Sequence, residues 1–333
     1  MNPNKGAPGP ADAWSGRRPD FSDVLAAARR IAPHAHFTPV LQSRSLDALV
    51  GAQLHFKCEN LQRGGAFKFR GACNAVWSLG DAEASAGHGV VTHSSGNHGA
   101  ALALAAQTRG IAAHVVVPEG AVKSKLTAIQ AYGATLHVCA PTMAAREAMA
   151  AAVQERTGAR LVHPFTDPAV IAGQGTAALE LLQQVGPLDV VMVPVGGGGL
   201  AGGTALAVAG SSPSTRVVGA EPEGAADAFE SLRRGTRVTD LVPDTVCDGL
   251  RGTIGEINFE LLRAHRVEVL LVSDAETLAA MRLAWERLKV VIEPSSATVL
   301  AAVLRNRERF AGQRIGLILS GGNVDLDALM ARA

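Results

Sequence analysis

Short apolar runs alternate with longer helical stretches along most of the chain, and this alternation limits the folds that it can adopt. Strands that are separated by helices form parallel sheets, because the crossover helix returns the chain to the same end of the sheet. We therefore predict an α/β fold with parallel sheets that carry helices on both faces. The predicted strands are 53–58, 89–93, 114–117, 135–138, 190–193, 216–220, 267–272 and 315–319. The predicted helices are 22–31, capped by Ser22, and 100–108, 122–131, 143–156, 200–209, 276–289 and 295–307.

Composition excludes several classes of function. The 333 residues include 31 Lys+Arg and 30 Asp+Glu, so the net charge of +1 gives no electrostatic reason to bind nucleic acid or an anionic membrane. The cysteines are widely spaced without a CxxC pair, which favours reduced thiols in a cytoplasmic protein over a zinc site or a disulfide framework. No apolar run has the length of a membrane span. Residues 1–20 lack the apolar region of a secretory signal, and we expect a flexible tail.

Four consecutive glycines, Gly196 to Gly199, follow a predicted strand and precede a predicted helix. Glycine lets backbone N–H groups approach an anion, and the helix N-terminus adds positive partial charge, so the segment is typical of a phosphate cradle. Gly197, Gly199 and Gly202 also satisfy GxGxxG, and Glu221 ends the next strand as in a dinucleotide-binding fold. A smaller phosphorylated cofactor, a nicotinamide dinucleotide and a turn without a ligand all remain open from this pattern.

Lys68 lies between two phenylalanines, Phe67 and Phe69, beside glycine and alanine. These neighbours suggest burial, which lowers the pKa of a lysine and makes it a nucleophile toward a carbonyl group. The alternative is an ordinary lysine at the start of a helix, whose aliphatic part is covered while its amine reaches solvent.

Taken together, these segments resemble the fold-type II pyridoxal-phosphate enzymes, the tryptophan synthase β-like family. Residues 65–72 (GAFKFRGA) resemble the family's cofactor-lysine motif, 94–99 (SSGNHG) its substrate loop, and 320–323 (SGGN) its pyridine-nitrogen site. The resemblance runs from about Ala35 to Leu326, with the segments in the family's order. It is strongest to the serine racemases and to the short serine/threonine and hydroxyaspartate dehydratases. It implies two domains with open, twisted parallel sheets: a large domain from 21–80 and 167–333, and a small mobile domain from 85–165.

The resemblance also implies roles for individual residues. Lys68 would hold pyridoxal 5'-phosphate covalently, and Ser95 would act as acid and base on the opposite face of the cofactor, where short threonine dehydratases carry Ala. Phe165 departs from the family pattern, because serine racemases have Asn there. The implied cofactor-binding residues are Phe67, Lys68, Asn97, Gly196, Gly197, Gly198, Gly199 and Ser320. The implied substrate-binding residues are Ser94, Ser95, Asn97, His98 and Arg146. A divalent cation (Mg²⁺, Mn²⁺ or Ca²⁺) would be held by Glu221, the carbonyl of Ala225, and Asp227.

The implied activity is dehydration and deamination of a β-hydroxy amino acid, such as serine, threonine or 3-hydroxyaspartate, to a 2-oxo acid and ammonia. Amino-acid racemisation is a possible accompanying activity, and a racemase acting mainly on serine or aspartate is the alternative. A nicotinamide-dependent dehydrogenase is a distant alternative, because it leaves Lys68 and the turn at Ser320 without a role. A non-catalytic binder of small molecules on the same fold is the third hypothesis. The family leads us to expect a homodimer.

Overall fold

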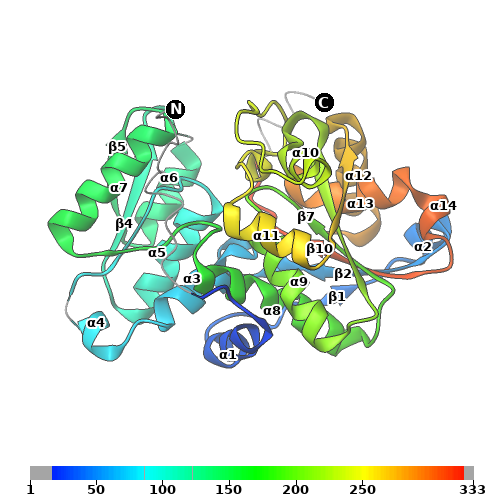
Figure 1. Cartoon of the computed structure of the whole chain (residues 1–333), viewed down its shortest axis with the longest axis horizontal. Helices are drawn as coiled ribbons and strands as arrows, with labels where there is room; N and C mark the ends of the chain where they lie inside the picture. The colour runs from blue at the N-terminus through cyan, green and yellow to red at the C-terminus, as the bar shows by residue number, and fades with distance from the viewer. Residues whose placement is uncertain (1–16, 86, 122, 326–333) are drawn as a thin grey trace, which may run out of the picture.

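The computed structural model describes residues 17–85, 87–121 and 123–325, which form two β-sheets with helices on both faces (Figure 1). The larger sheet has the strand order β1-β2-β10-β7-β8-β9, and the smaller has the order β5-β4-β3-β6. Every strand pair is parallel except β1 with β2. The α/β fold predicted from the sequence is therefore confirmed.

The strands are β1 (Val40–Leu41), β2 (Gln53–Cys58), β3 (Val90–Thr92), β4 (Ala113–Pro118), β5 (Thr135–Cys139), β6 (Arg160–Leu161), β7 (Val190–Pro194), β8 (Arg216–Pro222), β9 (Glu268–Val272) and β10 (Arg314–Leu319). The first helices are α1 (Phe21–Ile31), α2 (Arg44–Val50), α3 (Lys68–Trp77), α4 (Asp81–Ser85), α5 (Asn97–Arg109), α6 (Lys123–Ala131) and α7 (Met143–Thr157). The later helices are α8 (Pro168–Val185), α9 (Gly199–Ser211), α10 (Asp227–Arg234), α11 (Glu256–Ala264), α12 (Asp274–Leu288), α13 (Pro294–Arg305) and α14 (Arg307–Phe310).

The start of α1 corrects one expectation. Asp20, not Ser22, caps this helix: its carboxylate accepts from the Ser22 backbone N–H at 2.8 Å, and the Asp23 carboxylate accepts from the Asp20 N–H at 2.8 Å. Arg17 bonds both carboxylates, at 2.7 Å to Asp20 and 2.6 Å to Asp23. A helix N-cap residue bonds the free backbone N–H groups two or three residues further on, and the residue at that position here is Asp20. The rest of the predicted tail, residues 1–16, lies outside the described residues.

The smaller sheet and helices α5, α6 and α7 form a small unit between residues 90 and 161, and the larger sheet with its helices forms a large unit (Figure 1). Helix α3 joins them, because it packs against α5 of the small unit and against α8 of the large unit. The small unit lies within the 85–165 segment expected to be mobile, and its movement stays a prediction.

A buried set of charges fixes α3. Arg70 has no solvent-exposed surface, and its guanidinium bonds Glu59 at 2.6 Å and Glu180 of α8 at 2.7 Å. Lys57 of β2 also bonds Glu180, at 2.7 Å. Buried charges are tolerated only when they are paired, so these contacts hold α3 in one position against β2 and α8. Lys68 is the first residue of this fixed helix.

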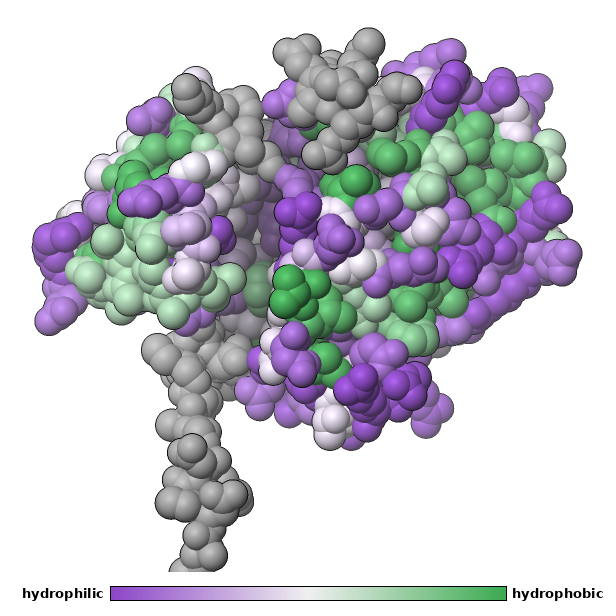
Figure 2. Space-filling view, turned by 90° about the horizontal axis from the view of Figure 1, so that it is seen from above, coloured by the Kyte–Doolittle hydropathy of each residue, from purple (hydrophilic) through white to green (hydrophobic). Residues whose placement is uncertain are grey.

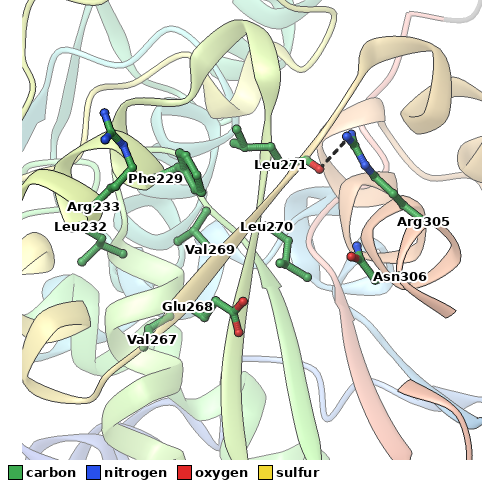
Figure 3. A pocket seen from close by; sticks show the side chains of 10 residues that line it. All are labelled: Phe229, Leu232, Arg233, Val267, Glu268, Val269, Leu270, Leu271, Arg305 and Asn306. Carbon is green, nitrogen blue, oxygen red and sulfur yellow. Dashed lines mark hydrogen bonds between the residues drawn. The ribbon is translucent and has the colours of Figure 1, made fainter. Parts of the chain in front are cut away.

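Strand β9 lies at one edge of the larger sheet, between α10 and the end of α13 (Figure 3). A shallow cavity of about 410 Å³ covers it. Arg305 donates to the backbone carbonyl of Leu271 on this edge at 3.3 Å, and Arg309 pairs with Glu268. None of the helices in the described part of the chain combines the length and the hydropathy of a membrane span.

Candidate active site

A cavity of about 610 Å³ lies between the two units, where Figure 2 shows a furrow in the surface. It opens at the carboxyl ends of β3, β7 and β10, which is where parallel sheets place their ligands. The cavity brings together all the residues predicted to bind cofactor or substrate: Phe67, Lys68, Ser94, Ser95, Asn97, His98, Arg146, Gly196, Gly197, Gly198, Gly199 and Ser320. The three residues predicted to bind a metal do not line it.

Lys68 opens α3, and its amine donates to the backbone carbonyl of Pro164 at 2.8 Å. Burial in the cavity lowers the pKa of Lys68 to about 8, and the carboxylate of Glu293 opposes part of this shift. An amine with this pKa is unprotonated in a substantial fraction of molecules near neutral pH, and it can then attack a carbonyl group or accept a proton. Lys68 is thus partly buried, in the direction that the two flanking phenylalanines suggested.

The glycine segment joins β7 to α9 and needs glycine for steric reasons. A Cβ atom on Gly197 would lie 2.5 Å from the ring of Phe165, and one on Gly196 would lie 2.8 Å from the Cα of Leu250. Gly198 has φ +86°, in the left-handed region. The bare backbone at the N-terminus of α9 fits a phosphate group, which is the anionic part of pyridoxal phosphate.

Glu221 does not serve this glycine segment. Its side chain is fully buried, and its two carboxylate oxygens accept from the backbone N–H groups of Ala228 at 2.9 Å and Phe229 at 2.8 Å. The dinucleotide hypothesis required this carboxylate to reach a ribose beside the glycines. Because both of its oxygens bond the backbone of α10, Glu221 is not available to bind a ribose, and the dinucleotide hypothesis has no acidic residue for that role.

Ser94 and Ser95 lie on the loop that leads into α5, and Asn97 follows them in the cavity wall. Asn97 begins this helix, and its amide nitrogen donates to both oxygens of Glu293, at 3.1 and 3.2 Å. Its carbonyl oxygen accepts from Asn323 at 3.0 Å, which fixes the orientation of the amide. The start of α5 faces the cavity, and free backbone N–H groups of this kind suit a substrate carboxylate.

The histidines around this loop are neutral at pH 7. His98 is 1% exposed, its Nε2 lies 3.3 Å from the carbonyl of Val162, and burial lowers its pKa well below the usual value. Burial also lowers the pKa of His93, and that of His163 to about 3. A neutral ring gives a substrate carboxylate no positive charge, so the predicted role of His98 would fall to its backbone N–H.

Ser320 follows β10 and is 3% exposed. Its hydroxyl lies 3.0 Å from the hydroxyl of Ser296, which also bonds the backbone of Gly321. The backbone carbonyl of Ser320 accepts from the N–H of Phe67 at 2.9 Å. The group available to a cofactor ring nitrogen here is thus a neutral hydroxyl, held next to the lysine segment.

The cavity also contains residues to which the sequence analysis gave no role: Glu293, Arg251, Asp248, His93 and Phe165. The Nε of Arg146, on α7, is buried in this wall and has no hydrogen-bond partner in the described part of the chain. Arg251, from the large unit, donates to the backbone carbonyl of Thr245 at 3.1 and 2.5 Å. The sequence marks Glu293 only as a glutamate directly before the proline that starts a helix. This pattern does not reveal that the side chain turns into the cavity.

The predicted metal ligands form a separate buried pair of carboxylates. Burial and the neighbouring Asp227 raise the pKa of Glu221 to about 8, and burial raises the pKa of Asp227 to about 6. Asp227 also accepts from the N–H of Ile254 at 2.7 Å. Among the described residues, no group of three or more His, Cys, Asp or Glu is arranged to hold a metal ion. Two buried oxygen ligands that resist ionisation fit a hard cation, provided that backbone or water oxygens complete its shell.

The sequence matches a family model described as pyridoxal-phosphate dependent enzyme over residues 31–321. It is 49% identical to the β-hydroxyaspartate dehydratase of Paracoccus denitrificans over 311 residues, 93% of this chain and 98% of that protein. It is 47% identical to the serine racemase of Dictyostelium discoideum over 313 residues, 93% of this chain and 96% of that protein. A crystal structure of serine racemase from the same organism superposes with a TM-score of 0.88 at 46% identity, covering 92% and 99% of the two chains. The crystal structure of a threonine deaminase gives a TM-score of 0.86 at 47% identity, with the same coverage.

The fold and the lysine cavity define a pyridoxal-phosphate enzyme acting on amino acids. The chain belongs to the pyridoxal-phosphate dependent enzymes, as the resemblance implied. Its similarity to dehydratases and racemases alike places its activity in the ammonia-lyase and racemase group.

Proposed function

We propose that the enzyme dehydrates a 3-hydroxyaspartate to a 2-oxo acid and ammonia, with racemisation as an accompanying reaction. The observation that carries this choice is the pair of arginines in the cavity wall. Arg146 and Arg251 come from different units and line the same cavity as Lys68. A second carboxylate on the substrate pairs well with guanidinium groups, whereas serine and threonine offer them nothing of comparable strength. Two relatives support the choice by name, the β-hydroxyaspartate dehydratase and an L-threo-3-hydroxyaspartate ammonia-lyase from Saccharomyces cerevisiae, 44% identical.

Each part of the chain has a task in this reaction. Lys68 would hold the cofactor, the backbone of Gly196 to Gly199 would bind its phosphate, Asn97 would bind its ring hydroxyl and Ser320 its ring nitrogen. Pyridoxal phosphate, when bound, supplies an electron sink for negative charge at Cα. The backbone N–H groups at the start of α5 bind the α-carboxylate of the substrate, and Arg146 binds the distal one.

Protons move at two places. The Lys68 amine takes the proton from Cα, and loss of the β-hydroxyl as water follows when that oxygen is protonated. For racemisation, the Ser95 hydroxyl returns a proton to Cα from the opposite face. The neutral Ser320 hydroxyl does not stabilise a positive charge on the ring nitrogen as a carboxylate would, which favours prompt loss of the β-hydroxyl over transamination.

Closure of the 85–165 segment over the substrate would exclude water and bring Arg146 toward the distal carboxylate. A divalent cation at Glu221, Asp227 and the Ala225 carbonyl, a homodimer and a cytoplasmic location complete the proposal. The fit of two buried carboxylates to a hard cation supports the first of these.

The test compares Arg146→Gln with Arg156→Gln, a control on the same helix but outside the cavity. Each variant is assayed for 2-oxo acid from 3-hydroxyaspartate isomers and from L-serine. We expect R146Q to lower kcat/KM for hydroxyaspartate about 10- to 100-fold, the worth of one charge-assisted bond, and to change that for serine by less than about threefold. Equal losses on both substrates would remove the basis for the dicarboxylate proposal.

The same preparations measure racemisation. We expect Ser95→Ala to abolish formation of the opposite enantiomer while leaving 2-oxo acid production within a few-fold. Enantiomer production that survives in S95A would show that another group serves the second face.

A further inference from the structure

Glu293 places a buried carboxylate inside the active-site cavity, and none of the steps above uses it. The residue is the N-cap of α13, yet its side chain makes no capping hydrogen bond to that helix. Its backbone is fixed instead, with its N–H donating to Gly321 at 3.0 Å and its carbonyl accepting from Ser296 at 3.0 Å. An acidic N-cap residue normally satisfies its own helix, so a side chain turned into the cavity indicates a different task.

Gly321 makes room for this carboxylate. A Cβ atom on Gly321 would lie 2.9 Å from one oxygen of Glu293 and 3.0 Å from its carboxyl carbon, closer than real Cβ contacts allow. Gly249 lies on another side of the same oxygen, where a Cβ atom would be in ordinary contact at 3.6 Å. The side chain is left 3% exposed. Such a pocket holds the carboxylate in one place rather than letting it reach bulk water.

The carboxylate also connects the two units. Asn97, at the start of α5 in the small unit, donates to it at 3.1 and 3.2 Å. Asn323 of the large unit bonds the other end of the same amide and donates to the carbonyl of Gly64 at 2.8 Å. The Asn97 nitrogen is thereby directed toward Glu293 and cannot flip without losing both contacts.

The charges that line the cavity give Glu293 its importance. The cations are Lys68 from α3, Arg146 from α7 and Arg251 from the large unit, and His93 and His98 face the cavity as neutral rings. Asp248, the other carboxylate in this wall, is exposed to solvent. Water screens an exposed charge much more than a buried one, so Glu293 is the carboxylate better placed to act on Lys68. In agreement with this geometry, burial lowers the pKa of Lys68 and the charge of Glu293 raises it again in part.

We propose that Glu293 is the counter-charge of the active-site lysine: it holds a proton on the Lys68 nitrogen, and it fixes the orientation of the Asn97 amide. When Lys68 takes the Cα proton, the Cα–H bond breaks, the proton binds Nζ, and the nitrogen becomes positively charged inside the cavity. A fixed carboxylate lowers the free energy of that charged form. Glu293 thus acts through Lys68 and Asn97 as a positioning residue, whatever the substrate.

The holoenzyme gives a readout that does not depend on turnover, because the visible absorbance of the bound cofactor reports the protonation of the Lys68 nitrogen joined to it. This absorbance is titrated with pH in the wild type, Glu293→Gln and Glu293→Asp. Glu286→Gln is the matched control, because Glu286 is an exposed glutamate on α12 paired with Arg282. We expect E293Q to lower the midpoint by about one pH unit or more, since an opposite charge nearby shifts a pKa by about one to three units. We expect E293D, which keeps the charge but draws it back, to give a smaller shift in the same direction, and E286Q to give none.

A second measurement follows exchange of the substrate Cα–H with deuterium from solvent. We expect this exchange to slow about tenfold or more in E293Q and to recover largely in E293D. An E293Q holoenzyme that folds, binds cofactor and titrates at the wild-type midpoint would overturn the proposal. If E293Q does not fold, E293D decides it, and an unshifted midpoint there overturns it as well. A purely structural role would reduce cofactor content without moving the midpoint.

Discussion

Glu221 and Asp227 yield a quantitative expectation about pH, because two carboxylates share one buried place. In the cation-free protein, the pKa of Glu221 is raised from 4.5 to about 8. The folded state therefore binds a proton at this carboxyl that the unfolded state releases above pH 4.5. The contribution of this carboxyl to the free energy of unfolding is fully present below that pH, falls as pH rises, and stops falling near pH 8.

The size of the effect follows from the two pKa values. At pH 7 the carboxyl of the unfolded chain is fully ionised, because its pKa lies about 2.5 units lower, while the folded one is still mostly protonated. At about 1.4 kcal/mol for each unit, the free energy of unfolding is about 3 kcal/mol lower at pH 7 than below pH 4.5. For 333 residues this corresponds to a melting temperature about 4 °C lower at pH 7 than at pH 4.5. Glu221→Gln removes this ionisation, so the cation-free variant should lose most of the pH slope. Its overall stability should fall at every pH, because the amide NH2 cannot accept the backbone N–H that one carboxylate oxygen accepts now.

Mg²⁺ should act in the opposite direction, because it binds the ionised pair. Thermal unfolding is followed from pH 5 to 9 in chelator and in excess Mg²⁺, for the wild type, E221Q and the surface control E286Q. We expect Mg²⁺ to raise the wild-type midpoint more at pH 8 than at pH 5, and to have no effect on E221Q. A wild-type slope that E221Q retains, together with no response to Mg²⁺ at pH 8, would refute both the buried-pair argument and the cation site.

Two other substitutions test the packing that positions the site. Glu59→Gln leaves the fully buried guanidinium of Arg70 without one of its carboxylates, so we expect urea denaturation to show a loss of about 3 kcal/mol, and a loss below about 1 kcal/mol would contradict the role given to this ion pair. Gly197→Ala puts a methyl group 2.5 Å from the ring of Phe165, so we expect pyridoxal-phosphate binding to weaken about tenfold or more in an absorbance titration. The double variant with Phe165→Ala should recover part of that affinity, and no recovery would place the cause elsewhere.

The parts of the fold that were predictable are those whose physical cause is local. Val190 to Val193 and Ile315 to Leu319 are apolar runs because β7 and β10 are central parallel strands, buried on both faces. Helix α8 was not predicted as a helix, since it is buried on most sides and carries Gly173 and Gly175, so no polar face marks its period. Strands β1 and β6 have two residues each, too few for any pattern.

The site divides in the same way. Lys68, the glycine segment and the loops at Ser94 and Ser320 are short motifs whose backbone and flanking residues carry the signal. Glu293 depends on a contact with Asn97, 196 positions away, and no local pattern encodes it. For Glu221 the local pattern was misleading. Its spacing from the glycines fits a ribose ligand, but its carboxylate bonds the backbone of α10 instead.

The edge of the larger sheet bears on how copies of this enzyme can meet. An unpaired strand edge invites another strand, either from a second copy or from a partly unfolded neighbour. On β9 the guanidinium of Arg305 already donates to the carbonyl of Leu271 (Figure 3), and Arg309 pairs with the side chain of Glu268. A second chain would have to displace that charged side chain before it could bond this carbonyl. This contact opposes growth of the larger sheet from molecule to molecule at its β9 edge.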